Sequence, residues 1–146
     1  MKSIVEVIGR RSSEDYALVM LGNTIKKLQE RHYFLRFLQI KNTRYSEIKN
    51  VVTIDSSINE IDSEDLGKAM QEIVGMVVTA MGKDAGFFFV KEIKNKIRPN
   101  YGIALRNMGV DLDFMQFSFE VDKKQTRTLT IENSDVFRIK TLKKVC

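Results

Sequence analysis

The sequence predicts an α+β fold, in which an N-terminal bundle of about four to five helices packs on a C-terminal antiparallel meander of three to four strands. Through the first two-thirds of the chain, apolar residues recur at spacings of three and four, which is typical of amphipathic helices. From residue 114 they alternate with polar residues, which is typical of half-buried strands. Helices followed by strands in this way indicate an α+β domain.

The length and composition of the chain are those of one globular domain. Its 146 residues are enough to bury one continuous core. Hydrophobic residues make up 43% of the chain and charged residues 29%, which excludes an intrinsically disordered protein. The sequence has one proline and no low-complexity stretch that could act as a flexible linker. We therefore expect a single domain over residues 1 to 146.

The distribution of apolar residues and of cysteine predicts a cytoplasmic protein without membrane segments. The longest apolar stretch, residues 73 to 81, is much shorter than the roughly 20 residues of a membrane-spanning helix. The apolar residues before Gly9 are too few for the core of a secretory signal peptide. The only cysteine is Cys146, so neither an intramolecular disulfide nor a cysteine metal site can form.

The first part of the chain predicts a short strand and then a long helix. IVEVI, residues 4 to 8, is rich in β-branched residues and ends at Gly9. Ser12 and Ser13 precede two acidic residues, which marks a helix start. Over residues 13 to 41 one helical face carries Leu18, Leu21, Ile25, Leu28, His32 and Leu35.

Residues 44 to 61 are consistent with two structures. Tyr45, Ile48 and Ile58 fit one face of a helix, whereas VVTI at residues 51 to 54 could be extended. We expect a second, irregular helix in this region.

The next segment predicts a helix between Asp62 and Gly82. Asp62 or Ser63 can accept hydrogen bonds from the free N–H groups of the first turn. Apolar residues extend almost all round this helix, which predicts that it lies in the middle of the core. Gly82 ends the helix, because glycine readily adopts the left-handed conformation of a helix C-terminus.

The segment GKDAGFFFVKEIKNKI, residues 82 to 97, predicts another helix. Asp84 can cap it, and Phe89, Ile93 and Ile97 recur at spacings of four. A strand fits less well, since the alternation of apolar and polar residues fails beyond the three phenylalanines.

The remaining sequence predicts one short helix and then strands. Pro99 can occupy the first turn of a helix that Gly109 ends. Residues 126 to 133 and 136 to 142 read as the second and third strands of the meander. The first strand is FMQFSFEV, in which one face would carry Met115, Phe117, Phe119 and Val121.

Few catalytic chemistries fit the sequence, so we expect a protein that is not an enzyme and has no cofactor. His32 is the only histidine, and its place on an apolar helix face favours a structural role. Asp111 and Asp113 could contribute to a metal hydrolase site, but a polar turn after Gly109 is the stronger interpretation. No glycine-rich phosphate-binding motif occurs.

The net charge of +5 raises nucleic-acid binding as an alternative function. The basic residues are spread over the chain and mixed with acidic ones, which favours solvated helix faces over a phosphate-binding surface. A nucleic-acid-binding protein would use Arg10, Arg11, Arg127 and the lysine-rich C-terminus from Lys140 to Lys144.

Two sets of apolar residues are candidates for binding, although filling the core is the stronger interpretation of the first. A pocket for a small hydrophobic ligand could be lined by Met70, Met81, Phe87, Phe88, Phe89 and Met115. The chain also carries more apolar surface than a small domain easily buries, which predicts a homodimer. Its interface is expected on the first long helix, at Leu21, Ile25 and Leu28.

Residues 66 to 139 resemble the α+β superfamily that contains 4-vinyl-reductase-type domains, the TRAPP subunits of Golgi transport and heme–nitric-oxide-binding domains. The resemblance rests on the apolar helix before GKDAG (82 to 86), on LRNMG (105 to 109) and on a strand that ends in ENS (132 to 134). It implies a regulatory or adaptor domain, often dimeric, that holds a hydrophobic ligand between helices and sheet.

The sequence also departs from that superfamily. It lacks the cysteine-rich end of many 4-vinyl-reductase-type domains, and its one histidine, His32, lies outside the region that would ligate a heme. The resemblance therefore implies no metal, heme or catalytic residue. We expect a non-enzymatic regulatory or adaptor module that binds a small hydrophobic ligand or a protein partner.

Overall fold

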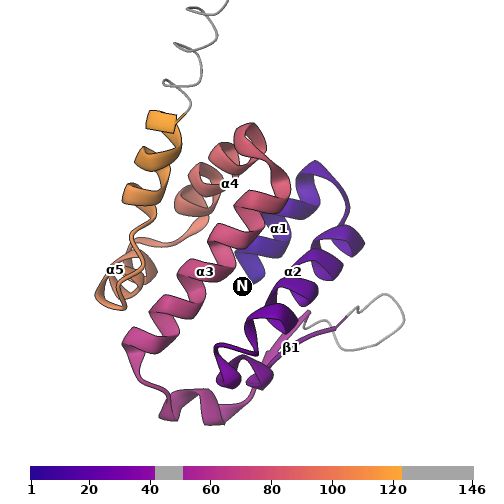
Figure 1. The fold of residues 1–146 in the computed structure, drawn as a ribbon, viewed down its shortest axis with the longest axis vertical. Coiled ribbons are helices and arrows are strands. Elements are labelled where there is room, and N and C mark those ends of the chain that lie inside the picture. Colours follow the sequence, from indigo (N-terminus) through magenta and orange to yellow (C-terminus); the bar gives the residue numbers. More distant parts are fainter. Residues whose placement is uncertain (42–50, 123–146) are drawn as a thin grey trace, which may run out of the picture. The chain divides into compact units, whose positions relative to one another are not determined.

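A computed structural model of the protein describes residues 1–41 and 51–122. The chain divides into two compact units, Met1–Leu112 and Asp113–Cys146, and each is described by itself. Figure 1 shows the elements of the first unit, in which the main helices are α1 (Lys2–Arg11), α2 (Glu14–Leu28), α3 (Ser63–Met81), α4 (Lys83–Lys96) and α5 (Pro99–Asn107).

The helices α1 to α4 pack as a closed set of four around one core. α1 contacts α2 and α4, and α3 contacts the same two helices, so each helix has two neighbours. In Figure 1, α3 accordingly runs between α2 and α4. The largest fully buried side chains of this core are Phe89, Ile8, Leu21, Leu28, Leu35, Ile73, Val7, Val77 and Val90.

The predicted strand at residues 4 to 8 is wrong, because these residues lie in α1. A strand would place alternate residues on one face, whereas α1 buries Ile4, Val5, Val7 and Ile8, which share one face of a helix. Contacts with α2 and α4 cover this face. Packing thus overrides the strand preference of β-branched residues, which is weak and depends on context.

The predicted long helix over residues 13 to 41 is correct only in its first half. Ser13 caps α2 by accepting a hydrogen bond from the N–H of Tyr16 at 3.1 Å, but the helix ends at Leu28. A 3-10 helix, η1 (Tyr33–Phe37), and strand β1 (Leu38–Ile40) follow.

Residues 51 to 60 contain a strand and a 3-10 helix rather than the irregular helix that we expected. β2 (Val52–Ile54) pairs antiparallel with β1, with Gln39 opposite Thr53, and η2 (Ser56–Glu60) follows. The extended alternative for VVTI is therefore the one that the structure adopts. The part of the predicted helix between residues 44 and 50 lies outside the described residues.

The predictions for α3, α4 and α5 are confirmed, apart from the cap of α4. Asp62 caps α3 by accepting a hydrogen bond from the N–H of Glu64 at 2.8 Å. Gly82 ends α3 with a φ of 82° and also forms the N-cap of α4, the position expected for Asp84. Pro99 begins α5, and Gly109 follows that helix with a φ of 84°.

A close approach of α3 and α4 explains the second glycine of GKDAG. A Cβ placed on Gly86 would lie 2.6 Å from Cγ1 of Val78 and 3.1 Å from its carbonyl oxygen. The two helices can therefore pack at this distance only because residue 86 has no side chain.

The predicted first strand of the C-terminal meander is wrong. Residues 112 to 122 are helical, and Ser118 Oγ donates to the carbonyl oxygen of Phe114, one turn earlier, at 2.9 Å. The alternation over these residues also satisfies a helical spacing, because Phe114, Phe117 and Val121 recur at intervals of three and four.

These findings overturn the predicted α+β fold of a bundle packed on a meander. Within residues 1–41 and 51–122 the only sheet is the two-stranded pair β1–β2, which precedes α3 instead of following the helices. The expected strands at residues 126 to 133 and 136 to 142 lie outside the described part of the chain. The protein is mostly helical over the residues that the structure describes.

Candidate ligand-binding site

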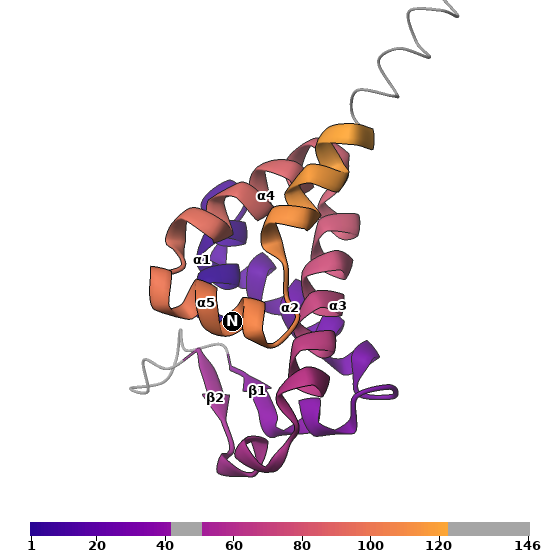
Figure 2. The same cartoon turned by 90° about the vertical axis from the view of Figure 1, so that its left-hand side faces the viewer.

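A cavity of ≈ 650 Å³ lies within the first unit, between α5 and the residues of α1, α3 and α4 that face it. None of the residues of α5 is buried, whereas α1 and α3 each bury several apolar side chains. Figure 2 shows α5, in orange, beside α3 and below α4. The space exists because α5 covers the end of the core without packing tightly against it.

The inner surface of the cavity is apolar. Its floor consists of Ile4, Val74, Ile93 and Val110, none of which is more than 4% exposed. The rest of the apolar lining consists of half-buried side chains from α3, from the end of α4, and from α5 and the residues that follow it: Met70, Ile97, Leu105, Met108 and Leu112. Such a surface favours an apolar occupant, because burial removes the occupant's carbon atoms from water.

The charged side chains that line the cavity are Lys2, Glu6, Lys96 and Arg98. Lys96 Nζ donates a hydrogen bond to Glu6 Oε2 and so joins α4 to α1. This hydrogen bond lowers the pKa of the Glu6 carboxyl below its ordinary value. The ion pair therefore stabilises the fold above the ordinary pKa of glutamate, and its contribution is lost as the pH falls through the lowered pKa.

The structure brings one of the residues predicted to bind a ligand to this cavity, which is Met70. Phe89 is fully buried in the core, as expected for a core residue, and Phe88 is 42% exposed. Met81 and Phe87 are half-buried and lie outside the cavity lining. Met115 belongs to the second unit.

The lining residues that sequence reasoning missed come from segments far apart in the chain. We did not identify Ile4 as a lining residue, because we predicted a strand at residues 4 to 8. Leu105 and Met108 lie in the LRNMG stretch and both line the cavity. Their separation of three residues, which places them on one face of a helix, was the one signal in the sequence that could have identified them.

The residues predicted for a dimer interface lie inside the first unit. Leu21 and Leu28 are fully buried, and Ile25 is 3% exposed, because α2 turns this face toward α1 and α3. This face is therefore already covered by the chain itself. The other side of α2 is more exposed, with Tyr16 at 51% and Val19 at 60%.

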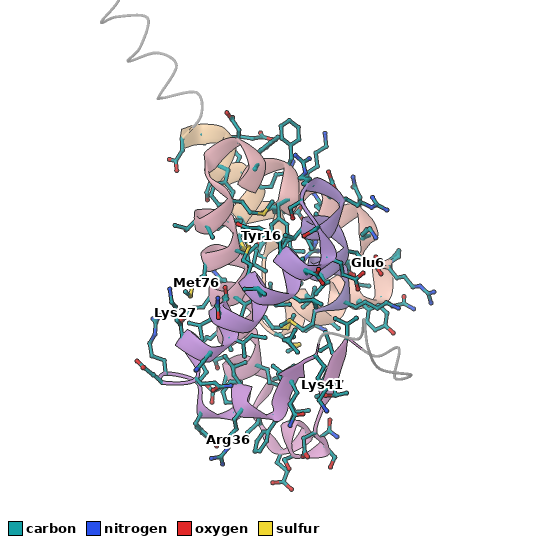
Figure 3. All side chains as sticks on the ribbon, turned by 90° about the vertical axis from the view of Figure 1, so that its right-hand side faces the viewer. Glu6, Tyr16, Lys27, Arg36, Lys41 and Met76 are labelled. Atoms are coloured by element: carbon teal, nitrogen blue, oxygen red, sulfur yellow. The ribbon has the colours of Figure 1, made fainter. Side chains whose placement is uncertain are left out.

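A second, more open groove of ≈ 860 Å³ runs between the outer faces of α2 and α3. Figure 3 shows Tyr16 and Lys27 of α2 and Met76 of α3 on this side of the molecule. The apolar side chains that line the groove are Tyr16, Val19, Met20, Met76 and Ala80.

His32 links the start of η1 to α3. Its Nε2 lies 3.2 Å from Glu72 Oε1, within ion-pair distance but outside hydrogen-bond geometry. Arg31 pairs with the other oxygen of Glu72 at 3.2 Å, and the His32 side chain is 14% exposed. These contacts suit the structural role expected for the histidine.

The basic residues that could contact nucleic acid are only partly within the described chain. Arg11 donates a hydrogen bond to Glu92 at 2.8 Å, and its guanidinium lies 5.3 Å from the centre of the Phe88 ring. Arg11 therefore already has partners within the fold. Arg127 and residues 140 to 144 lie outside the described residues.

Residues 1–41 and 51–122 contain neither a candidate metal site nor a candidate membrane span. Within these residues, no group of three or more histidine, cysteine, aspartate or glutamate side chains is placed to hold a metal ion. No helix among them combines the length and the hydropathy that crossing a membrane requires. Comparison of the chain with protein-family models, with curated proteins and with solved structures finds no match in any of the three.

Proposed function

We propose that the protein is a non-enzymatic cytoplasmic module that binds a small hydrophobic ligand in the cavity between α5 and the helices α1, α3 and α4. The observation that carries this proposal is the apolar floor of the cavity, formed by Ile4, Val74, Ile93 and Val110. The volume of ≈ 650 Å³ falls within the range of about 300–1,000 Å³ that is common for small-molecule pockets.

The position of α5 supports a regulatory role for this site. Because α5 buries none of its own residues, a ligand in the cavity would add apolar contacts that this helix lacks. Binding would then stabilise α5 against the other helices, by a free energy that grows with the logarithm of ligand concentration over the dissociation constant. Ile103, which is 60% exposed on α5 and lies outside the cavity lining, could present that change to a partner.

Blocking the cavity tests this proposal. We expect Met70→Trp to weaken the binding of a neutral apolar fluorescent probe, N-phenyl-1-naphthylamine, about tenfold or more, because the indole would occupy the ligand's space. Met76→Trp is the matched control, since Met76 lies on the same helix but lines the outer groove. Probe titration with circular dichroism as a folding check provides the measurement.

Two results would contradict this proposal. Probe binding that survives Met70→Trp in a folded protein contradicts the cavity as the site. Loss of binding in Met76→Trp alone would assign the ligand to the groove between α2 and α3.

A second candidate function is self-association through the outer face of α2, which would serve an adaptor role. Val19 and Tyr16 are exposed on this face beside the groove. α2 carries acidic residues in its first turn and basic residues in its last turn: Glu14, Asp15, Lys26 and Lys27. In an antiparallel two-fold pair, the acidic end of each α2 would therefore meet the basic end of the other, and the occupant that we propose is a second copy of this chain.

We expect Val19→Glu to dissociate this dimer, because it places two carboxylates at the centre of the pair. Sedimentation velocity at micromolar concentration measures the result. Ile103→Glu on α5 is the control, since Ile103 is as exposed as Val19, at 60%, and lies outside the groove. A wild-type monomer, or a dimer that Val19→Glu leaves intact, contradicts this interface.

A further inference from the structure

The charged groups at the cavity indicate the chemical class of the ligand, and this inference rests on the proposed function. Three of the four charged side chains in the lining are cationic, namely Lys2, Lys96 and Arg98, and the fourth is the carboxylate of Glu6. The lining thus carries a positive excess beside an apolar floor. The excess positive charge would not increase the affinity for a neutral hydrocarbon.

Two of these cations form no ion pair with a described residue, although the charge of Lys2 contributes to the lowered pKa of Glu6. Lys96 is paired with Glu6, which holds both charges in place between α4 and α1. Lys2, in the first turn of α1, and Arg98, the N-cap of α5, form no ion pair with a described residue. Both side chains are exposed, so they can reach a charged group that stays at the mouth of the cavity.

The apolar and cationic parts of the lining lie in one cavity. A ligand that places a hydrocarbon chain over Val74 and Ile93 and keeps an anionic group at the entrance would satisfy both. Arginine is well suited to this contact, because its planar guanidinium donates paired hydrogen bonds to carboxylate or phosphate.

We infer that the ligand is an anionic amphiphile, with its hydrocarbon chain in the cavity and its carboxylate or phosphate headgroup at Lys2 and Arg98. Each additional CH2 group that enters the cavity then tightens binding by about fourfold, until the space is filled. The Glu6 carboxylate competes with the headgroup for Lys96, so it limits the affinity for anions.

Three amphiphiles with different headgroups test this inference: dodecanoate, dodecanol and dodecyltrimethylammonium, each below its critical micelle concentration. Dodecanoate has one chain carbon fewer than the other two, so chain length alone would make it the weaker ligand. We expect dodecanoate to displace N-phenyl-1-naphthylamine most strongly and dodecyltrimethylammonium least. The preference for dodecanoate should fall as salt is added, since the cations are exposed and screened. Dodecyl phosphate in a parallel titration distinguishes a phosphate headgroup from a carboxylate.

Variants at the entrance locate the headgroup. Arg98→Gln and Lys2→Gln should each weaken dodecanoate binding by about two- to fivefold and leave dodecanol binding unchanged. Glu6→Gln should tighten dodecanoate binding by about two- to fivefold, because it frees Lys96. Lys91→Gln is the matched control, since Lys91 is exposed on α4 and lies outside the cavity lining.

The outcomes separate this inference from the proposed function. If dodecanol binds as tightly as dodecanoate, the cavity is a hydrophobic site and the inference about the headgroup is overturned. That inference is equally overturned if Arg98→Gln and Lys2→Gln both leave dodecanoate affinity unchanged. If dodecanoate, dodecanol and the fluorescent probe all fail to bind, the proposed function itself is contradicted.

Discussion

Ile25→Glu is expected to unfold the first unit rather than to leave a folded monomer. Ile25 is 3% exposed between α2 and its neighbours, so the substitution removes a buried side chain and introduces a buried carboxylate. Loss of the isoleucine alone costs about 2–5 kcal/mol. Desolvation of the charge adds to this cost, which together approaches the whole stability of about 5–15 kcal/mol that is usual for a domain.

Urea denaturation followed by circular dichroism measures this effect. Ile103→Glu is the control, because it makes the same change at an exposed position of α5, where substitutions shift stability by about 0.5 kcal/mol or less. Equal denaturation midpoints for the two variants would show that Ile25 does not lie in the core.

We expect Gly86→Leu to destabilise the protein by about 1–3 kcal/mol through overpacking. The cause is the approach of α4 to Val78, where even a Cβ would come within 2.6 Å of Cγ1. The leucine can be accommodated only if α3 and α4 move apart, and this opens contacts around Phe89. The measurement is the free energy of unfolding from urea titration.

Gly102→Leu provides the matched comparison for this prediction. A Cβ at Gly102 would meet no atom within 4 Å, so only the helix preference changes there. Leucine in place of a helical glycine should then raise stability by about 0.5–1 kcal/mol. If Gly86→Leu raised the midpoint as Gly102→Leu does, the close contact between α3 and α4 would be refuted.

The helices that could be predicted from the sequence are those with local start and stop signals. α3 has Asp62 and Gly82 at its ends, and α5 begins at Pro99. Such signals act within one helical turn, so they can be read without knowledge of the fold. α2 has a signal only at its start, and no glycine or proline marks its end at Leu28, so the predicted helix extended through residue 41.

The elements that were assigned wrongly depend on contacts between distant segments. IVEVI has the residue types of a strand, and only contacts with α2 and α4 give its apolar face a helical partner. FMQFSFEV satisfies both periods over its short length. In both segments, the residue types and the alternation of apolar and polar residues favoured a strand, whereas the spacing of the apolar residues also allowed a helix.

Little of the candidate site could be predicted from the sequence, because it too depends on contacts between distant segments. The cavity combines Ile4 with Ile93 and Leu105, which lie far apart in the chain and meet only after folding. The cations around it, including Arg98, belong to a charge pattern that we interpreted as solvated helix surface. Met70 was identified because methionine suits both a core and a pocket.

The position of α1 between α2 and α4 has a consequence for how the chain assembles during synthesis. Glu6 and Arg11 pair with Lys96 and Glu92, across sequence separations of 90 and 81 residues. α1 is synthesised before α4, yet one side of its apolar face has no partner until α4 has followed. Closing so long a loop also costs chain entropy. α1 is therefore fully packed only after the other three helices of the core have been synthesised, and its apolar residues depend on contacts with α2 until then.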